Sequence, residues 1–159
     1  MTETPSTERA ERPLAPPPIL YLSTLAVAVI LDRLLPLSHW QSGKITTIIG
    51  VALALLAMVI FASAWMRFKQ AGTHAPHWMP TTSLVTDGIF AYSRNPIYVA
   101  MTMLYLGIAM IVASLWMLIL LPPLLIVMQL GVIKREEAYL REKFGQPYID
   151  YCARVRRWV

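Results

Sequence analysis

The stretch that decides the fold is NPIYVAMTMLYLGIAMIVASLWMLILLPPLLIVMQLGVI, residues 95–133. It runs for 39 positions without an Asp, Glu, Lys or Arg. A helix that crosses the ~30 Å hydrocarbon core of a bilayer needs about 20 mostly apolar residues, so this stretch is long enough for two crossings. We therefore predict a helical hairpin, residues 96–113 and 115–133, that turns around Ser114. Pro122 and Pro123 fall inside its second helix and should kink it, because each removes a backbone donor.

Two further apolar stretches precede the hairpin, at residues 18–37 and 45–66. Only Asp32 and Arg33 carry charge within them. Charges inside a span often mark function, but this pair lies near one end of its helix, where snorkelling or mutual pairing accounts for it. Residues 1–17 are polar and rich in proline, which is typical of a disordered tail. The sequence thus predicts an all-α membrane helix bundle with four spans, formed by one domain over residues 18–159.

The composition agrees with lipid as the solvent. Hydrophobic residues make up 57% of the 159-residue chain and charged residues 14%, against roughly 25% charged in an ordinary soluble domain. A chain this small could not cover so much apolar surface in water. The single cysteine, Cys152, excludes an internal disulfide framework and a multi-cysteine metal site. His74 and His77 have the spacing of half a metal site, but no third ligand follows nearby, so we assign no metal.

The basic residues lie mostly on one side of the predicted membrane. With the N-terminus inside, twelve lysines and arginines occupy inner segments, and only Arg33 and Lys44 lie outside. The positive-inside rule places both termini in the cytoplasm, and it accounts for the net charge of +5 without a nucleic-acid partner. The inner side then carries two long, aromatic-rich segments, residues 67–95 and 134–159. Because loops of this length are usually functional, we expect them to fold together into a cytoplasmic cap.

The entrance of the hairpin contains residues that could carry chemistry. Asn95 suits the N-cap of the predicted helix and Pro96 its first position, and these roles explain both residues without a ligand. Arg94 then lies beside a helix N-terminus, whose free N–H groups favour anions. A guanidinium at that place indicates that an anion sits between the two.

A second charged cluster follows the hairpin. Residues 135–144 are predicted to form a helix that runs out of the last span and ends at Gly145, with another short helix after it. Glu137 and Arg141 lie four residues apart and can pair on the helix surface. Without a function, this segment would be an ordinary charged helix next to the membrane.

The two clusters together resemble a known superfamily. Arg-Asn-Pro-x-Tyr at residues 94–98, followed by Glu-Glu-x-x-Leu-x-x-x-Phe-Gly-x-x-Tyr-x-x-Tyr-x-x-Arg at 136–154, is similar to the isoprenylcysteine carboxyl methyltransferases and phospholipid N-methyltransferases, which are integral membrane enzymes. The resemblance covers residues 80–157, about half of the chain. It departs from the usual Arg-His-Pro motif in having Asn95 in place of the histidine.

The resemblance implies S-adenosylmethionine as the methyl donor, bound between the segment before the hairpin and the C-terminal segment. The donor's carboxylate suits basic groups or a helix N-terminus, and its ammonium and ribose hydroxyls suit carboxylates. The cofactor-binding residues expected from the resemblance are Leu84, Val85, Gly88, Tyr92, Asn95, Tyr98, Glu136, Glu137 and Tyr148.

Methyl transfer from a sulfonium is an in-line displacement, so positioning supplies much of the rate. The resemblance assigns Arg94 and Arg154 to orienting the acceptor and gives Glu137 a second role as a weak base. Arg154 could instead contact a lipid phosphate, as could Arg156 and Arg157. The acceptor is expected to be a lipophilic molecule taken from the bilayer. An isoprenylcysteine carboxylate, a lipid amine and a small hydrophobic thiol all stay open.

Two other functions fit some of the same residues. Membrane sterol reductases, which use NADPH, share the aromatic-Gly and Tyr-Cys patterns of residues 144–145 and 151–152, but they have many more spans. A small non-enzymatic membrane scaffold would use the motifs as helix caps and lipid contacts. We predict a membrane methyltransferase, with the bilayer and a lipophilic acceptor as its partners.

Overall fold

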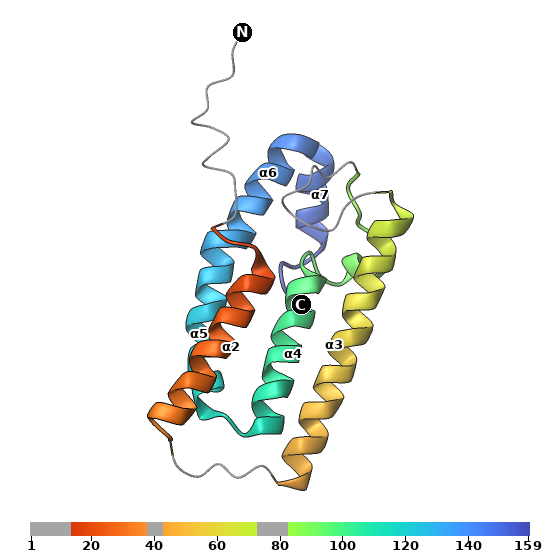
Figure 1. Ribbon diagram of the computed structural model, residues 1–159. Coiled ribbons are helices and arrows are strands. Elements are labelled where there is room, and N and C mark those ends of the chain that lie inside the picture. The colour runs from red at the N-terminus through yellow and green to blue at the C-terminus, as the bar shows by residue number, and fades with distance from the viewer. Residues whose placement is uncertain (1–13, 38–42, 73–82) are drawn as a thin grey trace.

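The structure is a computed structural model that describes residues 14–37, 43–72 and 83–159. Every regular element in these ranges is a helix, as predicted, and the long helices lie side by side with α6 and α7 at one end (Figure 1). The elements are α2 (Pro17–Leu34), α3 (Lys44–Gln70), the 3-10 turn η1 (Gly88–Ala91), α4 (Pro96–Val112), α5 (Leu115–Met128), the π-helical segment η2 (Gln129–Ile133), α6 (Lys134–Phe144) and α7 (Gln146–Arg154).

Three helices are long and apolar enough to cross a membrane: α2, α3 and the continuous helix Leu115–Phe144 that α5, η2 and α6 form. The last of these runs on beyond residue 133, as the sequence predicted, and Gly145 ends it with φ 57°. The helix α4 is apolar but has 17 residues, about 26 Å at 1.5 Å per residue. Its role as a fourth span stays a prediction.

The fold includes residues that were assigned to the tail. The Leu14 backbone N–H donates to the Gly131 carbonyl (3.0 Å), and α2 begins at the buried Pro17. A Cβ added to Gly131 would lie 3.3 Å from the Leu14 Cβ, so the π-helical segment and Leu14 are in close contact. The rest of the predicted tail, residues 1–13, and the pair His74 and His77 lie outside the described residues.

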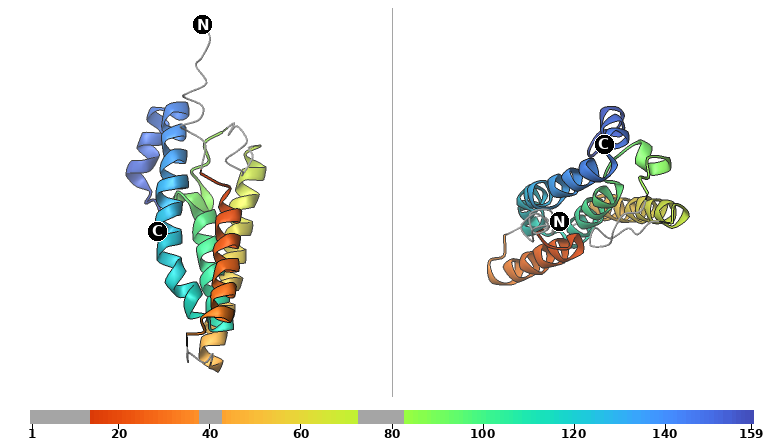
Figure 2. Two further views of the ribbon diagram at one scale, coloured as in Figure 1. Left: turned by 60° about the vertical axis from the view of Figure 1, so that its left-hand side comes forward. Right: turned by 90° about the horizontal axis from the view of Figure 1, so that it is seen from above.

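The helix α4 lies at the centre of the bundle. It packs against α3 on one side and against α5 and α2 on the other (Figure 2). Its contact with α3 depends on glycine: a Cβ added to Gly50 would come within 2.7 Å of the Gly107 carbonyl oxygen, and the reverse distance is also 2.7 Å. Ala57 and Ala64 continue the buried stripe of α3 at seven-residue spacing. Such small residues let two backbones approach in lipid, where dispersion rather than the hydrophobic effect joins helices.

The hairpin turns where the sequence placed it. Ala113 adopts φ 55° at the end of α4, and Ser114 is the N-cap of α5, its Oγ accepting from the Met117 N–H (3.1 Å). The same hydroxyl donates to Asp32 Oδ2 (2.5 Å), so the carboxylate near the end of α2 is paired with the turn. The charge flagged in the first span therefore has a structural partner.

The core lies where α2, α4 and α5 meet. The rings of Tyr21 and Tyr105 pack edge to face with centroids 6.2 Å apart, and Tyr21 Oη lies 2.7 Å from Thr102 Oγ1. Pro122 and Pro123 face outward, and the helix continues through both of them. The rod formed by α5 and α6 changes direction in its α5 part (Figure 2).

We expect Gly107→Ala to destabilise the bundle by about 1–3 kcal/mol, because the added methyl would overlap the Gly50 carbonyl and force α3 and α4 apart. Denaturant unfolding in detergent micelles measures this loss. At Gly43 the new Cβ would meet nothing closer than Thr46 Oγ1 at 3.9 Å. Gly43→Ala should therefore change the free energy of unfolding by only a few tenths of the loss expected for Gly107→Ala. A Gly107→Ala variant as stable as the parent would contradict the role of this contact.

Candidate functional site

The residues of the two motifs meet at one end of the bundle. The Arg94 N–H donates to the Arg156 carbonyl (3.0 Å), and Asn95 Nδ2 donates to the Arg157 carbonyl (2.9 Å). Residues 155–159, which we call the return segment, therefore pass beside the entrance of α4; Figure 1 shows the chain coming back from α7 to this place. The loop before α4 and the segment after α5 are thus in direct contact.

Glu137 is the centre of this charged cluster. Arg157 binds both of its carboxylate oxygens, through Nε and Nη2 at 2.7 Å each, and Arg94 Nη1 lies 3.2 Å from Oε1. The Glu137 side chain is only 10% exposed. An unpaired charge at such a place would be costly, and the two-point arginine contact is a strong form of pairing. Glu137 therefore ties α6 to both the entrance of α4 and the return segment.

Glu136 faces α4 instead. Tyr98, a buried residue of the first turns of α4, donates its hydroxyl to Glu136 Oε2 (3.1 Å). The π-helical segment η2 ends at Ile133, three residues before Glu136. A π turn holds more residues than an α turn, so η2 rotates the register in which α6 continues α5. Consecutive residues of a helix point about 100° apart, so the two glutamates bind different parts of the fold.

The helix α7 supplies another wall of the cluster. Arg94 Nη1 donates to Cys152 Sγ (2.7 Å), and Tyr151 Oη donates to the Phe90 carbonyl (2.7 Å), which joins α7 to η1. Burial raises the pKa of both Tyr148 and Tyr151 above the ordinary value of 10.0, so both phenols stay protonated at neutral pH. They act there as neutral hydrogen-bonding groups.

One donor of the cluster is left over. Among the described residues, two buried side-chain polar atoms have no hydrogen-bond partner: Arg94 Nε and, within the bundle, Tyr105 Oη. Buried donors in native proteins are nearly always satisfied, so an orphaned guanidinium N–H at a site of this kind is suited to a ligand oxygen.

The structure brings together six of the residues that the sequence singled out, which are Arg94, Asn95, Tyr98, Glu136, Glu137 and Tyr148. Asn95 occupies the N-cap position of α4, and Pro96 follows it at the first turn, as predicted. The Asn95 side chain makes no capping hydrogen bond, however, because its amide is used to hold the return segment.

Arg154 does not join the cluster. Its side chain is exposed, and its Nε donates to the Asp150 carbonyl (3.3 Å) one turn earlier on α7. Arg157, for which the sequence suggested a lipid-phosphate contact, contacts Glu137 instead. The helix α7 ends at Arg154, and only residues beyond that end turn back toward the bundle. The adjacent arginines Arg156 and Arg157 were the sequence signal for a partner of Glu137, but the sequence does not show where α7 ends.

The remaining predicted residues lie elsewhere. Gly88 and Tyr92 line a separate pocket of about 350 Å³ between η1 and α3, together with Ser63, Met66, Arg67, Gln70 and Ile89. Leu84 and Val85 are half-buried in the segment before η1. The predicted cofactor set is therefore divided among the charged cluster, this pocket and the segment before η1.

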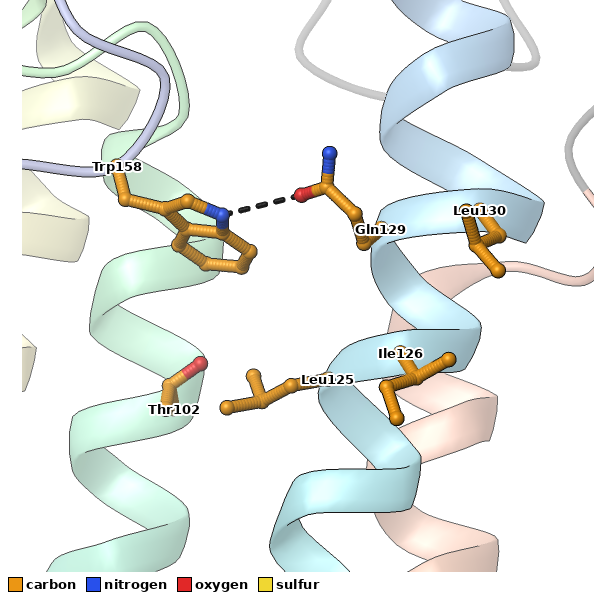
Figure 3. Close-up of a pocket in the computed structure, with 6 residues that line it drawn as sticks. All are labelled: Thr102, Leu125, Ile126, Gln129, Leu130 and Trp158. Atoms are coloured by element: carbon orange, nitrogen blue, oxygen red, sulfur yellow. Dashed lines mark hydrogen bonds between the residues drawn. The ribbon is translucent and has the colours of Figure 1, made fainter.

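An apolar cavity of about 480 Å³ lies between α4 and α5 (Figure 3). Its lining residues are Thr102, Leu125, Ile126, Gln129, Leu130 and Trp158. Trp158 Nε1 donates to Gln129 Oε1 (3.1 Å), which fixes the indole at this cavity. Because Trp158 directly follows Arg157, the cavity and the charged cluster are neighbours. No sequence pattern had indicated this cavity.

The fold and the site define a helical membrane protein in which a balanced charged cluster adjoins an apolar cavity. The model of the phospholipid methyltransferase family matches residues 45–147, which are 103 of the 159 residues. The chain belongs to that family, and the resemblance seen in the two motifs is confirmed: this is a membrane methyltransferase. Among curated proteins, none matches the chain. The matched range contains both glutamates and the Arg-Asn-Pro corner but not the return segment.

The different positions of Arg157 and Arg154 can be tested by the same substitution at each. Arg157→Leu should destabilise the fold by about 1–3 kcal/mol, because the buried Glu137 loses its two-point partner; the partial exposure of Arg157 keeps the loss below that of a fully buried pair. Arg154→Leu should stay within about 0.5 kcal/mol of the parent. Chemical unfolding in micelles measures both, and equal losses would contradict the assignment.

Proposed function

We propose that this protein transfers a methyl group from S-adenosylmethionine to a lipophilic acceptor at the cytoplasmic face of a membrane. The observation that carries the proposal is the meeting of the glutamate pair with the Arg94-Asn95 corner. Family membership supports methyl transfer over NADPH-dependent reduction and over a scaffold role. The bias of basic residues toward one side supports the cytoplasmic placement.

The charged cluster has groups of both signs for a zwitterionic donor. Glu136 and Glu137 provide carboxylates for an ammonium or for ribose hydroxyls, and Arg94 provides a buried N–H without a partner among the described residues. The N-terminus of α4 adds a favourable field for a carboxylate. S-adenosylmethionine, when bound, would supply a methyl group on a sulfonium, and the residues of the cluster would hold and orient its amino-acid part.

The apolar cavity suits the hydrocarbon part of an acceptor. It lies between the apolar helices α4 and α5, and its surface is almost wholly apolar although Thr102 and Gln129 belong to the lining. Its Trp158 wall is next to Arg157 of the charged cluster. A lipid held there would have its polar end toward the donor site, which is the alignment that an in-line transfer requires. If α4 and α5 both lie in the bilayer, such a molecule could enter the cavity sideways from the lipid without crossing water.

We propose a lipid amine as the acceptor, because the family is one of phospholipid methyltransferases. An amine has to lose a proton before or during transfer, and Glu136 and Glu137 are the carboxylates available for it. An isoprenylcysteine-type carboxylate is the alternative. The Arg94 guanidinium supports that alternative, since its planar fork can orient two carboxylate oxygens.

Purified protein with methyl-labelled S-adenosylmethionine and a total lipid extract should give a labelled product that partitions into the organic phase. Glu137→Gln should lower the rate about a hundredfold or more, because it removes the charge that organises the cluster. Glu142→Gln, an identical change on the exposed side of α6, should leave the rate within about twofold. Tyr98→Phe serves as a second variant, since it removes only the hydroxyl bound to Glu136. Label that stays in the aqueous phase with every lipid class would count against the proposal.

Filling the cavity should separate acceptor binding from donor binding. Leu125→Trp places a large ring in the cavity, so we expect the KM for the lipid acceptor to rise about tenfold while the Kd for S-adenosylmethionine changes little. Ile119→Trp is the matched control, because Ile119 is 50% exposed on α5 and is not among the lining residues. Steady-state rates over a lipid series and equilibrium dialysis of the donor give the two constants. An unchanged KM in Leu125→Trp would exclude this cavity as the acceptor site.

A further inference from the structure

The pocket between α3 and η1 is separate from the charged cluster and the apolar cavity, although two of its lining residues, Gly88 and Tyr92, are among the expected cofactor-binding residues. It lies across η1 from the charged cluster: Phe90 of η1 packs its ring against Phe68 (centroids 4.9 Å apart) and binds Tyr151 through its carbonyl, while Ile89 and Tyr92 line the pocket. The pocket holds about 350 Å³ and has both apolar and polar walls. Its apolar walls are Met66 and Ile89, and its polar walls include Arg67, Gln70 and Tyr92.

The Arg67 guanidinium lines this pocket and has two side-chain partners there. Its Nη1 lies 2.9 Å from Asp87 Oδ2 and 3.5 Å from Gln70 Oε1. Gly88 adopts φ +60°, and a Cβ added there would lie 2.4 Å from Arg67 Nε. Glycine at position 88 therefore serves both the left-handed backbone and the close approach of the guanidinium. Since both side-chain partners bind Nη1, the fork formed by Nε and Nη2 is the edge that can bind a ligand, and it matches two oxygens of a phosphate.

The residues around the pocket are of the kinds that proteins place at a membrane–water interface. On α3, Phe61 and Trp65 stack with ring centroids 6.1 Å apart, and Trp65 is half exposed. Tryptophan is enriched at the membrane–water interface, and Arg67 and Lys69 follow within the last turn of the helix. Tyr92, 75% exposed, presents an amphipathic ring at the same pocket.

We propose that this pocket binds the phosphodiester of a membrane phospholipid, at a site separate from the acceptor cavity. Arg67 is the anion-binding group, the Tyr92 hydroxyl is a second donor, and Met66 and Ile89 contact the glycerol and the first chain carbons. The formal charges of Arg67 and Lys69 against Asp87 leave one positive charge at this corner. We choose a lipid over a soluble phosphate because Met66 extends the pocket wall onto the exposed apolar face of α3.

The bound lipid would brace η1 from the outside. Phe68 and Tyr151 already hold η1 through Phe90. The chain reaches Asn95, at the corner of the charged cluster, four residues after η1 ends at Ala91. Occupancy of the pocket would therefore hold the segment that carries Arg94. The binding itself does not depend on the proposed methyl transfer, so it can be measured without an active enzyme.

The test is native mass spectrometry of the full-length protein in detergent, titrated with dioleoylphosphatidylglycerol. Dioleoylglycerol, which has the same chains and no phosphate, is the control ligand. We expect the parent protein to retain the phospholipid and Arg67→Gln to weaken it about tenfold. Lys69→Gln removes the same charge two residues away, outside the lining, and should weaken it less than about twofold.

Several outcomes would overturn the proposal. Equal losses in Arg67→Gln and Lys69→Gln would show general attraction to a basic surface, and equal retention of dioleoylglycerol would show that the phosphate is not recognised. Arg67→Lys keeps the charge and removes the fork, so a variant that binds as well as the parent would also contradict the site. Competition by soluble glycerol 3-phosphate at concentrations comparable to the lipid would show that the ligand is a free phosphate. Retained phospholipid binding with no methyl transfer would leave this inference intact and contradict the proposed function.

Discussion

The buried carboxylate of Glu137 is the constraint on which the site depends. A charge with 10% exposure at the edge of an apolar bundle needs strong partners, and here two guanidinium groups from separate segments provide them. Arg94 comes from the entrance of α4 and Arg157 from the return segment, so one ion pair network fixes three parts of the chain. Asn95 strengthens the arrangement because its amide holds the carbonyl of Arg157. The position of Trp158 then follows from that of its neighbour.

Lipid as the solvent explains the rest of the architecture. Large apolar side chains of α3 point outward, and the helix buries little more than glycine and alanine against α4. Two pairs of polar groups within the bundle bind one another: Ser114 pairs with Asp32, and Tyr21 pairs with Thr102. Each such pair joins two helices, so the few polar residues determine which helices are neighbours, while the close backbone contacts bring them together.

Local sequence signals predicted the elements well because these signals act over a few residues. The turn at Ser114, the start of α4 at Asn95-Pro96 and the stop at Gly145 each depend on capping or backbone preferences that the letters show directly. The meeting of the two motifs was also predictable, by resemblance. Which arginine reaches Glu137 was not, because it depends on where α7 ends and the chain reverses. The division of the expected cofactor residues among separate places and the cavity under Trp158 are likewise products of tertiary packing.

The return segment makes the polar and apolar parts of the site interdependent. Arg157 neutralises Glu137 and Trp158 closes one side of the cavity, and a single peptide bond joins them. A movement of Arg157 away from Glu137 would carry the indole with it and cost the hydrogen bond to Gln129. A ligand that competes for Glu137 would therefore alter the wall of the apolar cavity, even without touching it. In a family of phospholipid methyltransferases, such adjacency keeps the polar and the apolar part of the site from changing independently.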